Sequence, residues 1–252
     1  MKFWLPGALL ALGAVTSFAQ APLAADPAKA AHSGPSPVVV ELYTSQGCSS
    51  CPPADAFLGE LARREGVLAL SFHVDYWNYM GWKDPFSSPA STARQRAYVS
   101  TLGQGYVYTP QMVIDGRAQA VGSNRATVGR IIDGLAGSPK LSVALAPEGR
   151  DKIKVRIPAA DYAGKAAVWL VAYDDEHATK ITRGENQGRS LSYFHVVRAI
   201  RRVGTWSGEA VELSVNLLEA GVSGFGNCAI IVQGEGMGPV LGAAAIAMGG
   251  SN

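Results

Sequence analysis

The sequence predicts two domains: an α/β domain over about residues 36–137, followed by an antiparallel, sandwich-like all-β domain over residues 138–252. The first is indicated by apolar strand-like runs that alternate with amphipathic helical segments. The second is indicated by about seven short apolar runs separated by turns rich in Gly, Asp and Asn, which is typical of antiparallel sandwiches. Gly137-Ser138-Pro139 has the composition of a linker between the two.

Residues 1–19 are predicted to be a secretory signal peptide. Lys2 supplies the positive start, residues 5–15 supply the apolar core, and Ala19 is a small residue at the cleavage site. The apolar run is shorter than the roughly 20 residues that a membrane-spanning helix needs. Residues 20–35 predict a flexible tether. We therefore expect a periplasmic or secreted protein with no membrane span after signal cleavage, in a compartment where disulfides persist.

The charge balance argues against a nucleic-acid partner. The chain of 252 residues has 22 Lys and Arg against 20 Asp and Glu, a net charge of +2. The short group Arg198, Arg201 and Arg202 is the largest basic cluster, and a solvated strand edge explains it. No nucleic acid is expected among the partners of this protein.

The elements of the first domain follow from local patterns. Residues 38–43 are β-branched and almost all apolar, which predicts a buried strand, and an amphipathic helix follows a short turn. Pro52 and Pro53 are tolerated in its first turn, where N–H groups have no intrahelical partner. The further predicted elements are a strand at 67–74, a helix at 91–102, a hairpin of strands 111–114 and 118–121, and a closing helix that ends near 135.

The motif Cys48-Ser49-Ser50-Cys51 lies where the first strand leads into the first helix. This is the arrangement that thiol–disulfide exchange needs. A helix N-terminus favours the thiolate, so Cys48 is expected to be the exposed nucleophile and Cys51 the more buried resolving thiol. The third cysteine, Cys228, lies in an apolar run and is expected to be an inert buried thiol.

From the strand with Glu41 through the cysteine turn and the Thr109-Pro110 dipeptide to the closing helix, the first domain resembles the thioredoxin fold. The stretches ELYTSQGCSSCPPAD, HVDYWNYMGWKDPF and YTPQMVIDGR resemble the exported domain-of-unknown-function 1223 family still more closely. That family implies a thioredoxin-like N-terminal domain and no established activity. The thioredoxin resemblance implies that Pro110 is cis and packs beside the cysteines.

Glu41 stands within the first apolar strand. A carboxylate there is costly unless it is partnered, so it either faces water at a strand edge or is a buried acid. Thioredoxin-like domains often place an acid here, and the resemblance implies that Glu41 carries a proton to or from Cys51. Asp55 is the weaker candidate, because an acid in a first helical turn commonly complements the helix dipole.

Two further alternatives concern the surroundings of the cysteine pair. The two thiolates could join His73 in a metal site, but structural zinc usually needs four protein ligands and no second Cys or Cys/His pair accompanies them. No metal and no cofactor is therefore expected. The aromatic and polar residues from His73 to Trp82 predict either a packed loop or a peptide-docking surface beside the cysteines.

The leading hypothesis is an exported thiol–disulfide oxidoreductase that acts on protein thiols or disulfides through Cys48 and Cys51, with Pro110 shaping the substrate groove. Its partner is a cysteine-containing protein, as substrate or as redox partner. The alternative is a redox-inert thioredoxin-like binding or assembly module with a permanent disulfide, because a fold alone does not imply an activity.

Overall fold

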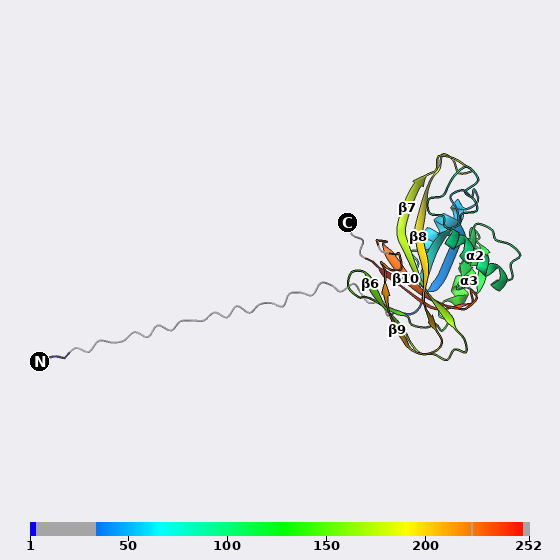
Figure 1. Ribbon diagram of the computed structural model, residues 1–252. Helices are drawn as coiled ribbons and strands as arrows, with labels where there is room; N and C mark the ends of the chain where they lie inside the picture. The colour runs from blue at the N-terminus through cyan, green and yellow to red at the C-terminus, as the bar shows by residue number, and fades with distance from the viewer. Residues whose placement is uncertain (4–33, 223, 249–252) are drawn as a thin grey trace.

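The computed structural model describes residues 1–3, 34–222 and 224–248. Nearly all of the predicted signal peptide and tether lies outside these residues. The helices are α1 (Pro52–Leu61), α2 (Pro89–Thr101) and α3 (Arg125–Leu135). The strands are β1 (Val38–Thr44), β2 (Val67–His73), β3 (Gln111–Ile114), β4 (Ala118–Val121), β5 (Ala144–Pro147), β6 (Lys152–Ile157), β7 (Ala166–Lys180), β8 (Ser190–Trp206), β9 (Val211–Asn216), β10 (Asn227–Gly234) and β11 (Val240–Ala247) (Figure 1).

The predicted fold class is wrong, because strands from both predicted domains form one mixed sheet. Its order is β11-β10-β7-β8-β2-β1-β3-β4, and the remaining strands form a separate sheet of order β5-β6-β9. The described chain is thus mostly β, and is not a thioredoxin-like α/β domain followed by an antiparallel all-β sandwich. The sheet runs across the domain boundary predicted at residue 138, and that boundary stays a prediction.

The junction between the two parts of the sheet is the contact of β8 with β2. These strands pair in parallel at Ser71 and Val196, while β1 pairs along the other side of β2. Without β8, strand β2 would be an edge with unpaired backbone groups, and native proteins commonly cover such an edge. The imidazole Nδ1 of His195 adds a hydrogen bond to the carbonyl oxygen of Ala69, 2.8 Å away. The junction therefore provides hydrogen-bond partners for backbone groups of β2 that would lack them in two separate domains.

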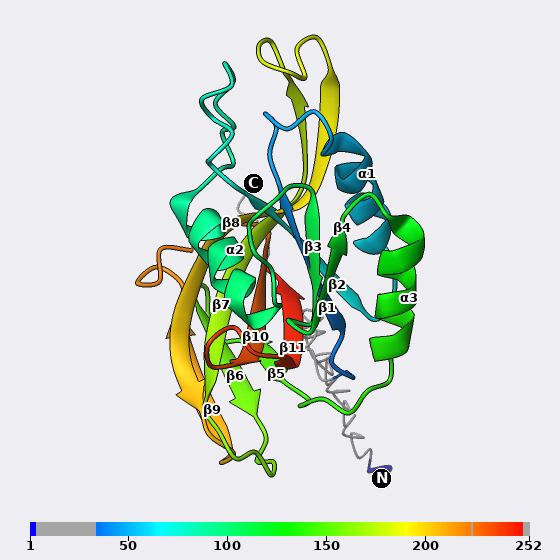
Figure 2. The same cartoon turned by 90° about the vertical axis from the view of Figure 1, so that its right-hand side faces the viewer.

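The hairpin of β7 and β8 is longer than the sheet that contains it. Strand β10 pairs with β7 only as far as Tyr173, whereas the β7–β8 pairing continues to Lys180 and Ser190. The distal half projects beyond the sheet at the end where β1 leads into α1 (Figure 2). Helix α1 packs against it closely, since a side chain at Gly59 would lie 2.4 Å from the ring of Phe194.

Strand β1 separates two apolar clusters. Val38, Val40 and Leu42 pack with buried residues of α1 and α3 on one face of the sheet. Val39 and Tyr43 pack on the opposite face, which α2 covers. Successive side chains of a strand point to opposite faces, so every second residue of β1 belongs to the same cluster.

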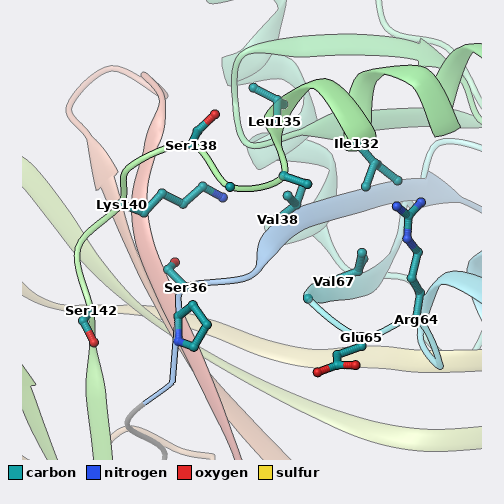
Figure 3. A pocket seen from close by; sticks show the side chains of 14 residues that line it. Ser36, Val38, Arg64, Glu65, Val67, Ile132, Leu135, Ser138, Lys140 and Ser142 are labelled. Atoms are coloured by element: carbon teal, nitrogen blue, oxygen red, sulfur yellow. The ribbon is translucent and has the colours of Figure 1, made fainter.

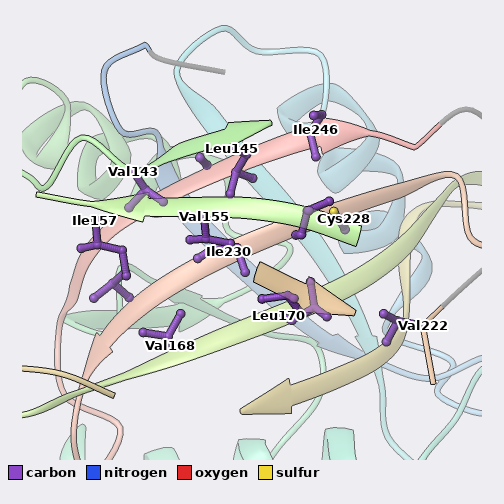
Figure 4. Packing of buried hydrophobic residues seen from close by; sticks show 14 of the residues in the cluster. Val143, Leu145, Val155, Ile157, Val168, Leu170, Val222, Cys228, Ile230 and Ile246 are labelled. Carbon is purple, nitrogen blue, oxygen red and sulfur yellow. The ribbon is translucent and has the colours of Figure 1, made fainter. Parts of the chain in front are cut away.

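A third apolar cluster fills the space between the two sheets (Figure 4). Leu145 and Val155 of the small sheet meet Leu170 and Ile230 of the large one there. Cys228 lies in this cluster with 2% of its surface exposed, and burial raises the pKa of its thiol to about 12. This placement agrees with the expectation of a buried, unreactive thiol.

Candidate redox site

Cys48 and Cys51 form a disulfide at the start of α1, with their Cα atoms 5.4 Å apart. Cys51 is the N-cap of the helix, which begins at Pro52. The N–H of Cys51 donates to the carbonyl oxygen of Cys48, which closes the turn. The sequence therefore correctly predicts a cysteine pair between a strand and a helix start.

The expectation of an exposed Cys48 is wrong for this disulfide-bonded structure. Cys48 is 1% exposed and Cys51 is fully buried, although Ser49 and Ser50 between them are exposed. The covering groups come from distant parts of the chain. On one side Trp77 packs so closely on the turn that a side chain at Gly47 would meet it at 3.2 Å.

Two hydroxyl groups lie next to the sulfur of Cys48. The hydroxyl of Thr109 donates to Cys48 Sγ at 3.3 Å, and the hydroxyl of Ser50 lies 3.4 Å from it. The Thr109–Pro110 peptide bond is cis, as the resemblance implied, and Pro110 is buried. Thr109, just before strand β3, therefore brings a hydroxyl donor to the cysteine pair.

The helix itself offers few N–H groups to a thiolate. Pro52 and Pro53 have none, and the N–H groups of Cys51 and Ala54 already donate to carbonyl oxygens of the turn. An anion at a helix N-terminus is normally stabilised by such free N–H groups together with the helix dipole. Here the hydroxyls, rather than N–H groups of α1, are the donors found beside the sulfur of Cys48.

Glu41 is buried but belongs to the opposite face of the sheet. Its carboxylate forms an ion pair with Arg94 of α2, at 2.6 Å from Nε and 2.8 Å from Nη2. It also accepts hydrogen bonds from the hydroxyls of Tyr43 and Tyr98, at 2.9 and 2.6 Å. Burial opposes the charge of Arg94, but Glu41, Tyr98 and Tyr43 together outweigh it and raise the pKa of the guanidinium. The Glu41 carboxylate therefore binds side chains of α2, and it does not point toward Cys51.

Asp55 is the acid beside the cysteine pair. It lies four residues after Cys51 in α1, and residues at this spacing have Cβ atoms about 5–6 Å apart on one helix face. One carboxyl oxygen accepts a hydrogen bond from the hydroxyl of Thr44 at 2.7 Å. The other has no hydrogen-bond partner among the described residues. Burial raises the pKa of Asp55 to about 7, against the lowering effects of His73 and the Thr44 bond.

A second acid completes this buried cluster. Asp84 and His73 lie 2.6 Å apart between Oδ2 and Nδ1, and the ring of Tyr193 lies 5.0 Å from that of His73. Burial raises the pKa of Asp84, but His73 and the hydrogen-bond donors outweigh it, so the net shift is downward. One of those donors is the N–H of Gln46, which ties Asp84 to the turn before the cysteines. The cluster therefore holds one ionised and one easily protonated carboxyl group.

The sequence contains a signal that separates the two acids. Leu42 and Thr44 share a face of β1, and both contact α1. Glu41 has the opposite parity and must point away from α1. Counting residues along the strand would therefore have favoured Asp55, whereas no local pattern announces the pairing of His73 with Asp84.

A cavity of about 400 Å³ lies at the other end of β1 (Figure 3). Apolar side chains of Val38, Ile132 and Leu135 line it, with Lys140 beside them. The Lys140 ammonium is paired with the carboxylate of Asp115 at 2.6 Å. None of the predicted site residues lines this cavity, so it is separate from the cysteine pair.

Two structural tests bear on other kinds of site. Over the stretches 1–3, 34–222 and 224–248, no group of three or more His, Cys, Asp and Glu residues is arranged to hold a metal ion. In the same part of the chain, no helix has the length and apolar character needed to cross a membrane.

Comparisons with known proteins identify the family. The family model described as a protein of unknown function, DUF1223, matches residues 39–233. The crystal structure of protein AGR_C_4864 from Agrobacterium tumefaciens is 30% identical, with 87% of this chain and 97% of that chain covered and a TM-score of 0.75. HBP35 of Porphyromonas gingivalis is 16% identical, with 84% and 74% covered and a TM-score of 0.55, which shows a similar fold alone. No match was found among curated proteins.

Proposed function

The chain belongs to the DUF1223 family of proteins of unknown function, and we propose from the geometry of its site that it is a thiol–disulfide oxidoreductase. The proposed substrates are cysteine-containing proteins, and the signal-like pattern of residues 1–19 supports an action in the periplasm or outside the cell. One observation carries the proposal: the disulfide at the start of α1 lies one helical turn before a buried carboxyl group with a pKa of about 7.

The exchange reaction needs no group beyond the substrate thiols. A substrate thiolate attacks Cys48 Sγ, a new sulfur–sulfur bond forms, and the bond to Cys51 breaks. Cys51 leaves as a thiolate and takes up a proton. A second substrate thiolate then attacks the mixed disulfide, which releases Cys48 as a thiolate and the substrate as a disulfide. The substrate is oxidised by two electrons and the protein is reduced, and the reverse sequence reduces a substrate disulfide.

Each neighbouring group has a role in these steps. The hydroxyls of Thr109 and Ser50 lie beside the disulfide-bonded sulfur of Cys48. In the proposed reaction they donate hydrogen bonds to the thiolate that this sulfur becomes. At an ordinary pKa near 8.5, only about 3% of a thiol is ionised at pH 7, so such donors increase the reactive fraction. Asp55 supplies the proton that Cys51 needs, because a carboxyl group with a pKa of about 7 holds a proton in about half of the molecules at pH 7.

The burial of both cysteines supports a second candidate, a redox-inert binding or assembly module with a structural disulfide. A disulfide that no thiolate reaches takes no part in exchange. The two functions differ in one measurable property, which is the reactivity of the disulfide in the folded protein.

The proposal is tested with the folded protein and glutathione. Reduced protein should be oxidised by glutathione disulfide, and the Cys51→Ala variant should instead accumulate one glutathione on Cys48, detected as an increase in intact mass. The matched Cys48→Ala variant leaves Cys51 alone and fully buried in this structure, and should accumulate far less. If folded wild-type protein is reduced by neither glutathione nor dithiothreitol, the oxidoreductase is excluded and the structural disulfide is correct.

A further inference from the structure

The tip of the β7–β8 hairpin, residues 181–189, lies on the turn that contains the disulfide. The side-chain amide of Asn186 donates hydrogen bonds to the carbonyl oxygens of Gln46 and Cys48, both at 3.0 Å. Its own amide oxygen accepts a hydrogen bond from Arg189 at 2.9 Å. Asn186 is 1% exposed. This hairpin tip is therefore fastened to the backbone on both sides of Gly47 by a single buried side chain.

A second contact brings negative charge to the same turn. The carboxylate of Glu185 accepts a hydrogen bond from the N–H of Ser49 at 3.2 Å. That N–H belongs to the residue after Cys48, where a free donor would help to stabilise a thiolate. An incoming thiolate also meets the repulsion of the Glu185 carboxylate. While the hairpin tip is in place, the Glu185 carboxylate therefore opposes the attack electrostatically.

The hairpin tip is held less firmly than the other cover of the disulfide. Apart from Ile181 and Asn186, its residues are exposed or half-buried. The loop between β2 and α2, which contains Trp77, is fixed by the buried His73–Asp84 pair and by further side-chain hydrogen bonds. Segments with few buried apolar contacts open most readily from a native fold. The hairpin tip is therefore the cover that opens at the lower cost.

We propose that the hairpin tip is a movable cover of the disulfide, and that Asn186 is the positioning residue that holds it closed. The inference rests on the proposed oxidoreductase. The hairpin tip leaves the turn, a substrate thiolate attacks Cys48 Sγ, and Cys51 departs with the electron pair of the broken sulfur–sulfur bond. Asn186 contacts the backbone of the turn and not its sulfur atoms, so it holds the hairpin tip closed whether the cysteines are oxidised or reduced. Opening therefore precedes attack in both directions of exchange.

A movable cover and a purely structural contact should affect the exchange rates and the reduction potential differently. A cover that opens before either direction of exchange changes the rates of reduction and oxidation by the same factor and leaves the reduction potential unchanged. A contact that stabilises only the disulfide would change the potential instead. Rate constants and potential, measured on the same variants, therefore distinguish the two.

The test uses three variants of the full chain. Asn186→Ala removes two hydrogen bonds to the turn and should increase the rate constants of reduction by dithiothreitol and oxidation by glutathione disulfide about tenfold. Glu185→Ala, at an exposed position, should increase the rate of reduction about threefold. Gln187→Ala changes an exposed residue of the same hairpin tip and should leave the rates at the wild-type value. Rates measured in low urea should show the weak denaturant dependence of local opening.

The failure of this inference differs from the failure of the proposed function. If wild type and all three variants exchange at equal rates, the disulfide is active but the hairpin tip is not its cover. If Asn186→Ala shifts the potential without accelerating both directions, Asn186 stabilises the disulfide and the cover is again excluded. If the disulfide is inert in every folded variant, the proposed oxidoreductase function is wrong, and the proposal of a movable cover is excluded together with it.

Discussion

Glu41 and Asp55 are both buried acids in the first part of the chain, yet their surroundings differ completely. Glu41 accepts hydrogen bonds from Arg94, Tyr43 and Tyr98, and both of its oxygens have partners. Asp55 has one hydrogen bond, from Thr44, and a second oxygen without a partner among the described residues. Glu41 is ionised and paired with a cation in the core. Asp55 is buried at lower cost when it is protonated, because burial raises its pKa to about 7.

This difference separates a structural acid from a chemical one. A buried carboxylate with a bidentate arginine and two hydroxyl donors holds elements together, and here it joins β1 to α2. A buried carboxyl group that is not hydrogen-bonded to a cation gains and loses its proton near neutral pH, which is what proton transfer requires. In this chain the second kind lies next to the cysteines and the first kind does not.

The largest expected effect is a loss of protein stability when the structural acid, Glu41, is replaced. Glu41→Gln leaves the buried guanidinium of Arg94 without its counter-charge, and we expect a loss of about 3–5 kcal/mol in the free energy of unfolding. The matched control is Glu60→Gln, which breaks an exposed ion pair with Arg125 and should change stability little. Urea denaturation at pH 7 measures both. A Glu41→Gln variant as stable as Glu60→Gln would contradict the structural role.

Asp55→Asn should change how stability depends on pH. The folded pKa of Asp55 is raised, so its favourable contribution is present below about pH 4 and is lost as pH rises towards 7. The change from 3.8 to about 7 corresponds to about 4 kcal/mol. The variant lacks this loss, because an amide accepts the Thr44 bond without ionising. Its stability relative to wild type should therefore rise by roughly this amount between pH 4 and 8, and equal pH profiles would disprove the raised pKa.

The same variant should alter the chemistry. In the proposed reaction the protonated carboxyl group gives its proton to the departing Cys51 below pH 7, so Asp55→Asn should slow reduction by dithiothreitol about tenfold at pH 6, with rates expressed per reagent thiolate. Above pH 8, where Asp55 is ionised in wild type, the two proteins should differ little. The exposed Asp133→Asn is the control. A constant ratio of rates across this pH range would remove Asp55 from the reaction.

The smallest effect is expected at the third cysteine. The thiol of Cys228 lies in the apolar core and burial raises its pKa to about 12, so it is hardly ionised at neutral pH. Cys228→Ser should leave the rate of exchange at the wild-type value. After mild reduction, a thiol reagent should label Cys48 in the folded protein and modify Cys228 only in urea. Rapid labelling of Cys228 in the folded protein would contradict its burial.

Local patterns in the sequence predict most of the elements. The apolar runs at 38–43 and 67–74 become β1 and β2, the hairpin predicted at 111–114 and 118–121 becomes β3 and β4, and the runs of the second half become strands β5 to β11. The cysteine turn is found where the motif places it. Period and turn chemistry are properties of a few neighbouring residues, and a single sequence contains them.

The order of strands and the identity of the acid depend on distant residues instead. The parallel contact of Ser71 with Val196 joins two segments that each form a regular pattern alone, so the single sheet was not predictable from either. Glu41 becomes structural only because Arg94 lies opposite it on α2. Asn186 looks like any polar loop residue until the hairpin brings it to Cys48.

The most direct test of the redox site is an equilibrium titration of the Cys48–Cys51 disulfide in dithiothreitol and glutathione buffers at pH 7. An exchange site should give a single two-electron transition between about −270 and −120 mV, the interval that characterised thiol oxidoreductases span. A disulfide that remains intact until below about −300 mV, or that is reduced only after the protein unfolds, would be a structural bond and would contradict the account.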